Sequence, residues 1–302
     1  MAVAEESLRR TRLFANPYLL LAAASLCWSG NHILGRAIAG HVPPMAIGTL
    51  RWLCAAALLW PFVRHQVAKD WPIVRAHLPV MIYLSLLGGA IFGALQFVGL
   101  QYTAALNVSV MNSLAPVLIV AASAVMFHDR ITARQGIGIA ISLVGVLAII
   151  SRLDPAVISG LGFNIGDIII LVNMGLWAVY SASLRLRPPI DGLSFMFLFA
   201  LISGIAMLPL WGWEISTGYV LQPTWLTAFA IMFVTLFSTI AAFVFWTRGV
   251  ELIGPNRAGV FLHLVPIYSA LLTGALLGEP LHAYHVVGFA LILAGVWCTS
   301  RR

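Results

Sequence analysis

The sequence predicts an all-α integral membrane protein, with ten transmembrane helices arranged as two inverted five-helix repeats and with both termini in the cytoplasm. Three observations lead to this fold class. The composition is strongly apolar, apolar runs of spanning length recur along the chain, and a spaced pattern in the first half returns in the second half.

The composition is that of a membrane protein. Of the 302 residues, 61% are hydrophobic and 9% are charged, whereas roughly 25% of the residues in a soluble domain are charged. At about 20 residues per span, the chain accommodates roughly ten spans and leaves no room for a separate catalytic domain. The net charge of +7 comes from basic residues spread singly between apolar runs, without the basic stripe that nucleic-acid binding needs. The composition therefore excludes a soluble enzyme and a nucleic-acid partner, and predicts a multi-pass protein of the inner (cytoplasmic) membrane whose surroundings are the lipid bilayer.

Ten apolar runs are separated by polar residues, and each predicts one spanning helix. The basic cluster at Arg9, Arg10 and Arg12 followed by a short apolar stretch resembles a signal peptide, but the apolar stretch continues to Ile38 and is too long for one. We therefore expect it to form the first helix. The ten runs cover residues 16–38, 43–63, 78–101, 107–127, 134–151, 165–185, 192–211, 224–248, 256–277 and 283–299.

Basic residues are divided unevenly between alternate loops. The N-terminus, every second loop and the C-terminus together carry 14 of the 17 basic residues; the opposite loops hold Arg36 and Arg152, and Arg51 falls within a helix. Because basic loops remain in the cytoplasm, both termini are predicted to be cytoplasmic, which requires an even number of helices. The 14 residues are Arg9, Arg10, Arg12, Arg64, Lys69, Arg75, Arg130, Arg134, Arg185, Arg187, Arg248, Arg257, Arg301 and Arg302.

The two halves of the chain share a pattern at a constant offset of 150 residues. An odd number of helices per half makes the second copy cross the membrane in the opposite sense, which is the inverted-repeat architecture of many secondary transporters. The predicted division is residues 1–151 and 165–302, joined by residues 152–164. The matched pairs are Pro116 and Pro266, Asp129 and Glu279, Gly138 and Gly288, and Gly145 and Gly295, with Trp28 and Trp177 and also Arg36 and Arg185 matching at an offset of 149.

Three motifs resemble the EamA family of the drug/metabolite transporter superfamily: Trp28-Ser29-Gly30-Asn31, Arg51-Trp52, and the repeated proline, acid and two glycines. The aromatic-rich stretches look most like the bacterial amino-acid exporters, including the aromatic branch. The resemblance implies a transporter, not an enzyme, that exports small metabolites, above all neutral and aromatic amino acids, by alternating access. Another polar metabolite, such as a purine, nucleoside or sugar derivative, remains an alternative.

One pair of residues departs from the pattern of that family. His128-Asp129 stands where Gly-Glu is expected, while Gly278-Glu279 keeps it. Because the site is at the edge of a loop, we expect the departure to affect the geometry of the helix end more than the choice of substrate.

The prolines at 116 and 266 interrupt the fourth and ninth predicted helices, and each removes a backbone hydrogen bond to the carbonyl four residues earlier. We predict that both act as hinges. Polar residues share a face with each proline, and these two faces are predicted to line the pathway, although small and polar residues also mediate helix packing. The faces consist of Ser109, Asn112, Ser113 and Pro116 in one half and Gly259, Leu262, His263 and Pro266 in the other.

Aromatic and polar residues share one face of the first predicted helix and one face of the sixth. These faces comprise Trp28, Asn31, His32 and Gly35 in the first helix, and Asn173, Trp177, Tyr180 and Ser181 in the sixth. Lipid penalises the polar members, which favours a cavity over core packing. Gln96 and Trp246 correspond at the same offset of 150 residues. The predicted substrate-binding residues are Trp28, Asn31, His32, Gln96, Asn112, Ser113, Trp177, Tyr180, Ser181, Trp246 and His263.

No carboxylate falls at the centre of a predicted helix, so no acid is positioned to bind a cationic drug or to carry a proton across the membrane. His32 and His263 are expected to act as neutral hydrogen-bonding residues more than as proton carriers. Arg51 must face protein or water. It either bonds to backbone carbonyls, the reading we favour, or attracts a substrate carboxylate.

No catalytic, metal or cofactor motif occurs in the context that it would need. A membrane enzyme, the remaining rival, would rest on His282, His285 and Glu279, whose loop position favours a solvated edge. The sequence predicts a small-molecule substrate and leaves open its identity, proton coupling, the net direction of transport, and whether the protein is a monomer or a homodimer.

Overall fold

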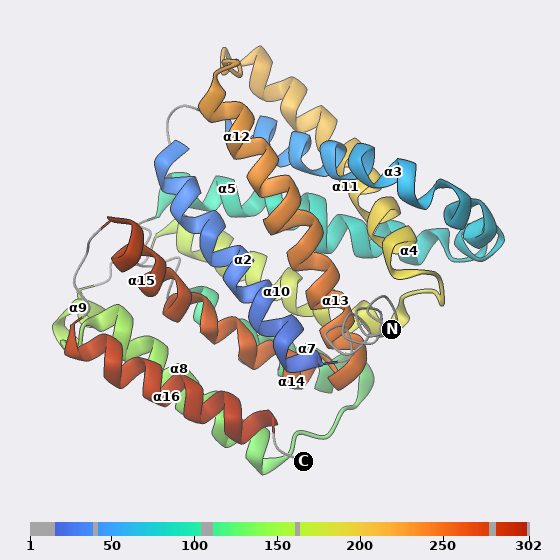
Figure 1. The fold of residues 1–302 in the computed structure, drawn as a ribbon. Coiled ribbons are helices and arrows are strands. Elements are labelled where there is room, and N and C mark those ends of the chain that lie inside the picture. Colours follow the sequence, from blue (N-terminus) through green and yellow to red (C-terminus); the bar gives the residue numbers. More distant parts are fainter. Residues whose placement is uncertain (1–15, 39–41, 104–110, 161–163, 278–281, 301–302) are drawn as a thin grey trace, which may run out of the picture.

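The computed structural model describes residues 16–38, 42–103, 111–160, 164–277 and 282–300 (Figure 1). In these ranges every regular element is a helix and no strand occurs. The predicted all-helical, membrane-type fold is therefore confirmed. Among the described residues, six helical segments are long and apolar enough to cross a membrane: Pro44–Ala76, Leu78–Gln96, Ala133–Ser151, Ile165–Leu186, Gly192–Ser216 and Trp225–Ile253.

The helices of the first half follow the predicted apolar runs closely at their starts. They are α2 (Pro17–Ile38), α3 (Pro44–Ala76), α4 (Leu78–Ser85), the π-helical η1 (Leu86–Ile91), α5 (Phe92–Tyr102), α7 (Ala115–Phe127), α8 (Ala133–Ser151) and the short α9 (Pro155–Ser159). Residues 107–110 of the predicted fourth span lie outside the described residues, and residues 111–113 are helical. The segment predicted to join the two halves contains α9.

The second half is built in the same way. Its elements are α10 (Ile165–Ser183), the 3-10 helix η2 (Leu184–Leu186), α11 (Gly192–Ser216), α12 (Trp225–Phe233), the π-helical η3 (Val234–Ala241), α13 (Ala242–Ile253), α14 (Pro255–Gly259), the 3-10 helix η4 (Val260–His263), α15 (Leu264–Leu277) and α16 (Ala283–Ser300). Capping boxes fix the starts of α8 and α10, where the side chains of Thr132 and Asn164 accept backbone N–H groups of the first turn.

Helices α3 and α11 end later than the apolar runs predict, and so does α13, which continues past residue 248 to Ile253. The run 43–63 becomes α3, which continues to Ala76, so Arg64, Lys69 and Arg75 lie on a helix and not in a loop. Likewise α11 continues past residue 211 to Ser216. The reason is that apolar runs mark the part of a helix inside hydrocarbon, whereas 33 residues of α3 extend about 50 Å at 1.5 Å per residue, beyond the roughly 30 Å of hydrocarbon.

Two acids expected in loops are buried parts of helices. Glu214, in the last turn of α11, accepts hydrogen bonds from the backbone N–H groups of Met45 at 2.9 Å and Ala46 at 2.8 Å. Asp70, in α3, accepts one from the backbone N–H of Asp191 at 3.2 Å. Both carboxylates satisfy amides at helix starts that have no partner within their own helix.

The loop after α7 carries the pair that departs from the family pattern. His128 ends the helix with φ at 56°, in the left-handed region that favours glycine. Asp129 then forms a two-bond ion pair with Arg185, at 3.0 and 2.7 Å, and this pair joins the first half of the chain to η2. The corresponding Gly278 and Glu279 lie outside the described residues.

Helices α8 and α16 lie side by side along their length (Figure 1). A Cβ atom on Gly138 would lie 2.7 Å from the carbonyl oxygen of Gly295, and a Cβ atom on Gly145 would lie 2.8 Å from that of Gly288. Only glycine permits this approach. The four glycines are the ones that repeat at the offset of 150, and each contact joins one residue of a matched pair to a member of the other pair.

The π-helical segments also occupy matched positions. Residues 86–91 of η1 correspond to residues 236–241 of η3 at the offset of 150. Nothing in the composition of either run predicts them, because π-helical turns depend on local insertion into the hydrogen-bond ladder and not on hydropathy. Such segments occur frequently at functional sites.

Candidate substrate pathway

Three predicted tryptophans meet in the middle of the described bundle. Trp28 of α2, Trp177 of α10 and Trp246 of α13 have ring centroids 5.5 to 5.6 Å apart in all three pairings. The indole N–H of Trp28 donates to the carbonyl of Ser238 at 3.2 Å, within the π-helical η3. The repeat-related residues Trp28 and Trp177 therefore touch across the two halves. We call these residues, with the rings described next, the aromatic cluster.

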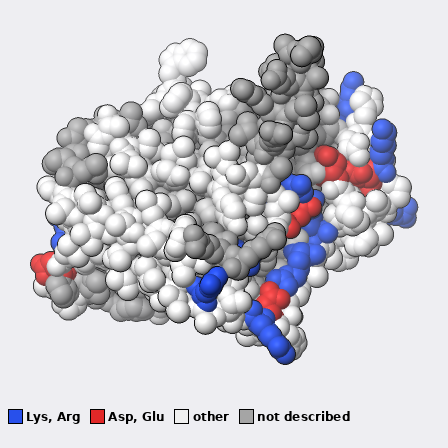
Figure 2. All heavy atoms as spheres, turned by 60° about the horizontal axis from the view of Figure 1, so that its bottom comes forward, with Lys and Arg blue, Asp and Glu red and all other residues white. Residues whose placement is uncertain are grey.

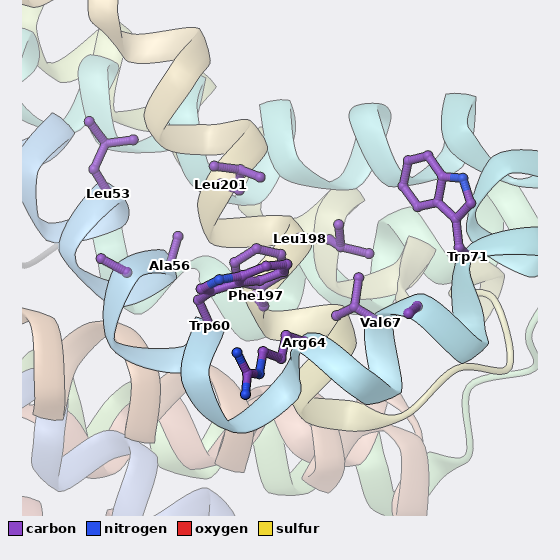
Figure 3. A pocket seen from close by; sticks show the side chains of 11 residues that line it. Leu53, Ala56, Trp60, Arg64, Val67, Trp71, Phe197, Leu198 and Leu201 are labelled. Atoms are coloured by element: carbon purple, nitrogen blue, oxygen red, sulfur yellow. The ribbon is translucent and has the colours of Figure 1, made fainter.

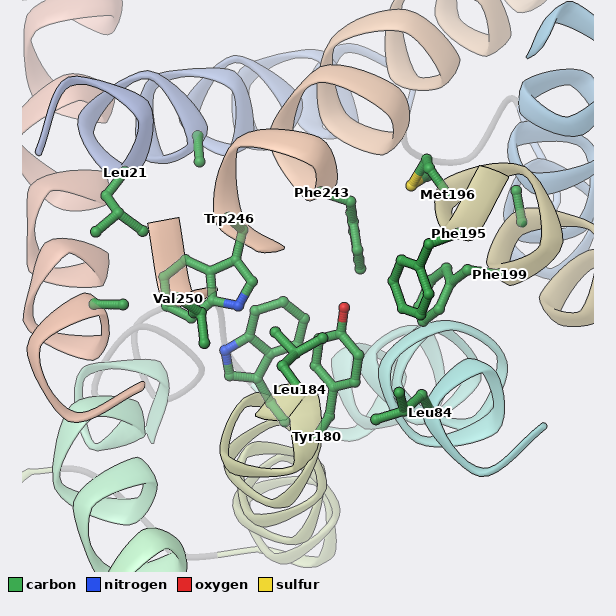
Figure 4. Close-up of a cluster of buried hydrophobic side chains, with 14 of the residues drawn as sticks. Leu21, Leu84, Tyr180, Leu184, Phe195, Met196, Phe199, Phe243, Trp246 and Val250 are labelled. Atoms are coloured by element: carbon green, nitrogen blue, oxygen red, sulfur yellow. The ribbon is translucent and has the colours of Figure 1, made fainter. Parts of the chain in front are cut away.

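The aromatic cluster extends toward α3 and α11 through Tyr180, which the sequence predicted, and through Phe243, Trp52 and Phe199, which are not among the predicted site residues. Tyr180 packs on Trp177 at 5.2 Å, as its place on the same helix face predicts. Phe243 contacts Trp28, Trp177 and Tyr180, and also Trp52, whose ring lies 5.3 Å from that of Phe199. Figure 4 shows Tyr180, Phe199, Phe243 and Trp246 converging from three helices. Phe243 lies three residues before Trp246, which is the signal that could have found it.

Several polar atoms inside and beside the aromatic cluster have no hydrogen-bond partner. They include the indole nitrogens of Trp246 and Trp52 and the hydroxyl of Ser181, all fully buried. A buried polar group without a partner costs about 1 to 3 kcal/mol in proteins. A bound molecule with acceptors and donors would recover that cost.

Gln96 and Asn173 form the second polar feature that the sequence predicted. The side-chain amide of Asn173 donates to the side-chain oxygen of Gln96 at 3.0 Å, joining α10 to α5. The oxygen of the Asn173 side chain has no partner, and neither does that of Asn112. Both are acceptors on faces that were predicted to line the pathway.

His263 is fully engaged by protein atoms. Its Nε2 lies 2.9 Å from the carbonyl oxygen of Ser113, and its Nδ1 lies 2.7 Å from the hydroxyl of Ser142. Because a carbonyl only accepts, Nε2 carries a hydrogen, and a neutral ring then accepts from Ser142 at Nδ1. Residues 113 and 263 correspond at the offset of 150, so this bond also joins repeat-related positions.

Both predicted hinge prolines follow irregular helix. Pro116 stands in the first turn of α7, after a turn at Leu114, and Pro266 stands in the first turn of α15, after η4. Pro116 packs against α14, since a Cβ atom on Gly259 would lie 3.4 Å from the Cα of Pro116. Hinge motion stays a prediction.

The remaining predicted residues, Asn31, His32, Ser109 and Arg51, are not part of the contacts described above. Asn31 is half-buried, and the side chain of His32 and the whole of Ser109 lie outside the described residues. The guanidinium of Arg51 is 9% exposed, yet no carbonyl oxygen in the described residues accepts a hydrogen bond from it. The expectation that Arg51 bonds to backbone carbonyls is therefore wrong, because the carbonyl groups of an α-helix are already paired within the helix.

A cavity of about 360 Å³ opens beside the aromatic cluster, at the end of the bundle that carries η2. Phe195, Met196 and Phe243 form its apolar wall, and Arg187, Asp191, Thr247, Arg248 and Glu251 are among its polar members. Glu251 pairs with Arg248 at 2.9 Å and lies 3.8 Å from Arg187. The cavity thus combines apolar surface with charges of both signs.

A second hollow is an apolar groove of about 720 Å³ on the outer surface of α3 and α11 (Figure 3). Trp60 and Phe197 lie in it with ring centroids 5.3 Å apart, and Arg64 stands at its edge. None of the predicted site residues lines this groove. On the face shown in Figure 2 most of the charged side chains lie in a band at the right and lower right, a smaller group lies at the left edge, and most of the described surface is uncharged.

The residues of the enzyme alternative do not form a metal site in the part of the chain that the structure describes, which holds no group of three or more potential ligands. His285 accepts a hydrogen bond from the backbone N–H of His282 at 3.0 Å, and Glu279 lies outside the described residues. The cysteines at 27, 54 and 298 are free and half-buried.

Comparison with known proteins identifies a family of transporters and relatives that are named transporters. The model of the EamA-like transporter family matches residues 16–151 and again residues 164–301. The uncharacterized transporter YyaM of Bacillus subtilis is 25% identical over 94% of this chain and 93% of its own length. An uncharacterized transporter of Archaeoglobus fulgidus is 26% identical over 94% and 97%. A solved crystal structure of a protein at 20% identity has a TM-score of 0.78 and covers 94% of this chain and 96% of its own, which shows a shared fold.

Proposed function

Since this chain belongs to the EamA-like transporter family, we propose that it exports small polar metabolites, neutral and aromatic amino acids above all, across the inner membrane. The family and its transporter-named relatives make the protein a multi-pass membrane transporter rather than an enzyme. The substrate, the direction and the alternating-access mechanism are the proposal.

The observation that carries the proposal is the aromatic cluster with its unpartnered polar atoms. Flat aromatic surfaces favour an apolar or aromatic side chain. The unpartnered indole nitrogens of Trp246 and Trp52 can donate, and the free side-chain oxygen of Asn173 can accept. An amphipathic zwitterion offers the complementary groups: a carboxylate, an ammonium and a side chain that packs on rings.

We propose ten spans in two inverted repeats. The spans would be α2, α3, α4 to α5, residues 111–127, α8, α10, α11, α12 to α13, α14 to α15, and α16. Three observations support a two-fold relation between the halves: the crossed glycine contacts of α8 and α16, the bond between residues 113 and 263, and the matched π-helical segments. The family model matching the chain twice supports it as well.

The cavity beside Phe243 supports a route into the aromatic cluster. Its charged rim carries Arg187 and Arg248, which belong to the set of loops predicted to face the cytoplasm. Phe243 lines the cavity and also touches Trp28 and Trp177. Substrate entering from the cytoplasm would therefore meet the aromatic cluster first, and alternating access would then open the opposite side.

Counterflow in proteoliposomes tests the proposal. Proteoliposomes that contain the purified protein are loaded with unlabelled L-phenylalanine or L-leucine. Uptake of the same amino acid in labelled form is then measured with and without a pH gradient. Nucleosides, purines and sugars run in parallel as the rival substrates. Saturable counterflow of neutral amino acids supports the proposal. Counterflow of only a nucleoside, purine or sugar would replace it, and an effect of the pH gradient would show proton coupling.

A further inference from the structure

Arg51 carries a positive charge deep in the structure. It lies seven residues after Pro44, the first residue of α3, which is about 10 Å along the helix axis. Its side chain is 9% exposed, and Trp52 next to it is fully buried in the aromatic cluster. A charge at this depth in a spanning helix is costly unless it is paired or reaches water, and marks a functional site by default.

Among the described residues, the Arg51 guanidinium has no acidic or carbonyl partner. No carboxylate or carbonyl oxygen lies within hydrogen-bond distance of the guanidinium, and its Nε is buried without a partner. Its one charge-specific contact is with the ring of Trp52, 5.0 Å from the guanidinium carbon. Other arginines of the protein differ, since Arg185 pairs with Asp129 and Arg248 pairs with Glu251.

Gly93 of α5 packs closely against the guanidinium. A Cβ atom on Gly93 would lie 3.0 Å from Nη2 of Arg51 and 3.9 Å from the sulfur of Met207. Gly93 follows η1, so the π-helical segment and the missing side chain both adjoin the charge. The ring of Trp52 also contacts Phe199 and Phe243 of the aromatic cluster. Arg51 therefore stands one residue away from the rings proposed to hold the substrate side chain.

We infer that Arg51 binds the carboxylate of the transported molecule, and that Gly93 lets the guanidinium pack against α5 beside that carboxylate. The planar guanidinium can donate two parallel hydrogen bonds to one carboxylate, which compensates the buried charge on both partners. This inference rests on the proposed function and deepens it, because it makes a carboxylate a requirement for binding. Amines, amides and esters of the same side chain would bind weakly.

Thermal unfolding in lipid nanodiscs with three probes tests the inference. L-Phenylalanine carries both charges, 3-phenylpropionate keeps the carboxylate without the amine, and L-phenylalaninamide keeps the amine without the carboxylate. We expect the first two to raise the melting temperature of the wild-type protein and the amide to do so far less. Arg51→Gln should weaken binding of both carboxylates by about tenfold to a hundredfold, the usual effect of a charged hydrogen bond, and leave the amide unchanged.

Two further variants keep the test decisive if Arg51→Gln folds poorly. Gly93→Ala retains the charge and places a methyl group against the mobile end of the arginine, so it should weaken carboxylate binding without changing the amide. Arg64→Gln is the matched control, because Arg64 is an exposed arginine on the same helix. It should behave as wild type.

The outcomes separate the inference from the proposed function. Carboxylates that stabilise the wild-type protein and the Arg51→Gln and Gly93→Ala variants equally, or that stabilise none of them, would overturn the role of Arg51. Carboxylate binding that depends on Arg51, together with no counterflow of any amino acid, would support the carboxylate site and reject amino-acid export.

Discussion

The rings of Trp28 and Trp177 meet edge to face with centroids 5.5 Å apart, although the residues are 149 positions apart in the sequence. The contact joins α2 to α10, the first helix of each half. Two residues that match in the repeat are thereby in direct contact. Both rings also touch Phe243 and Trp246. A conformational change between the halves must therefore rearrange this contact.

Conservative substitution separates the binding role of these tryptophans from packing. Trp28→Phe and Trp177→Phe keep a ring and remove the indole donor, whereas alanine at a buried tryptophan costs about 3 to 5 kcal/mol. We expect each phenylalanine variant to lower kcat/KM in counterflow about fivefold to tenfold with little change in melting temperature. Alanine at either position should impair transport further while the protein still folds.

Trp213→Phe, at an exposed position of α11, serves as the control and should leave transport unchanged. If activity and melting temperature fall in parallel in both phenylalanine variants, the rings only pack the core.

The sequence predicted which helix faces meet, but not the partners that meet them. Periodicity places Trp28, Trp177 and Tyr180 on inward faces, because residues three or four apart share a face of a helix. It does not show that Phe243 lies between them, since which side chains touch depends on helix rotation and crossing. The bond of His263 to residues 113 and 142 escaped prediction for the same reason.

Arg51 shows a second limit of prediction from the sequence. Sequence position alone could not decide between backbone bonds and a ligand, and only the surrounding atoms show that the expected carbonyl partners are missing. The left-handed backbone at His128 shows the opposite case, because the family pattern has glycine there and the observed φ of 56° explains why glycine suits it.

The crossed glycine contacts predict a strong effect of a single methyl group. Gly145→Ala places a Cβ atom 2.8 Å from the carbonyl of Gly288 and 2.9 Å from the backbone nitrogen of Ile292, so α8 and α16 must move apart. We expect a clear fall in melting temperature. Gly136→Ala on the same helix is the matched control, because nothing lies within 4 Å of its Cβ position. It should be neutral or stabilising by about 0.5 to 1 kcal/mol. Equal melting temperatures for both variants would contradict the close packing.

The ion pair of Asp129 with Arg185 gives a pH-dependent contribution to stability. Two hydrogen bonds from the Arg185 guanidinium hold the pKa of the Asp129 carboxyl below its usual range. A lowered pKa in the folded state means that the stabilisation is present above the unfolded pKa of about 3.9 and is lost as the pH falls through the folded value. Asp129→Asn should therefore cost about 0.2 to 1 kcal/mol at pH 7, a range set by solvent screening.

Thermal unfolding between pH 3 and pH 8 measures this contribution, and the difference between the two proteins should shrink at the acid end. Arg185→Gln should cause a similar loss, and the double variant should cost less than the sum of the two single variants. Fully additive losses would show that the two side chains do not interact in solution.

The distribution of basic residues predicts a cytoplasmic C-terminus. A reporter that is active only in the periplasm, fused after Arg302, should show little activity. The same reporter fused after Gly160, in the segment that carries Arg152 alone, should be active because that segment is predicted to face the periplasm. Strong activity of the C-terminal fusion would reverse the proposed orientation and place the cavity beside Phe243 on the outer side.

The two prolines are predicted to act as bending points in the exchange between inward-open and outward-open states. Each follows irregular helix, at Leu114 in one half and η4 in the other, and they correspond at the offset of 150. Replacing either with alanine restores a backbone donor to the carbonyl of Asn112 or Leu262, which should straighten the helix and favour one access state. If the repeats are inverted, the two substitutions should shift access in opposite directions.

Labelling of single cysteines from each side of the membrane measures this shift. Pro209→Ala, at a proline inside α11, is the control and should leave the labelling pattern unchanged. A static kink would persist through alanine substitution because neighbouring helices hold it, and then both variants would keep wild-type accessibility and full transport. That result would reject the hinge role, whereas opposite shifts in Pro116→Ala and Pro266→Ala would tie the two-fold relation of the helices to the transport cycle.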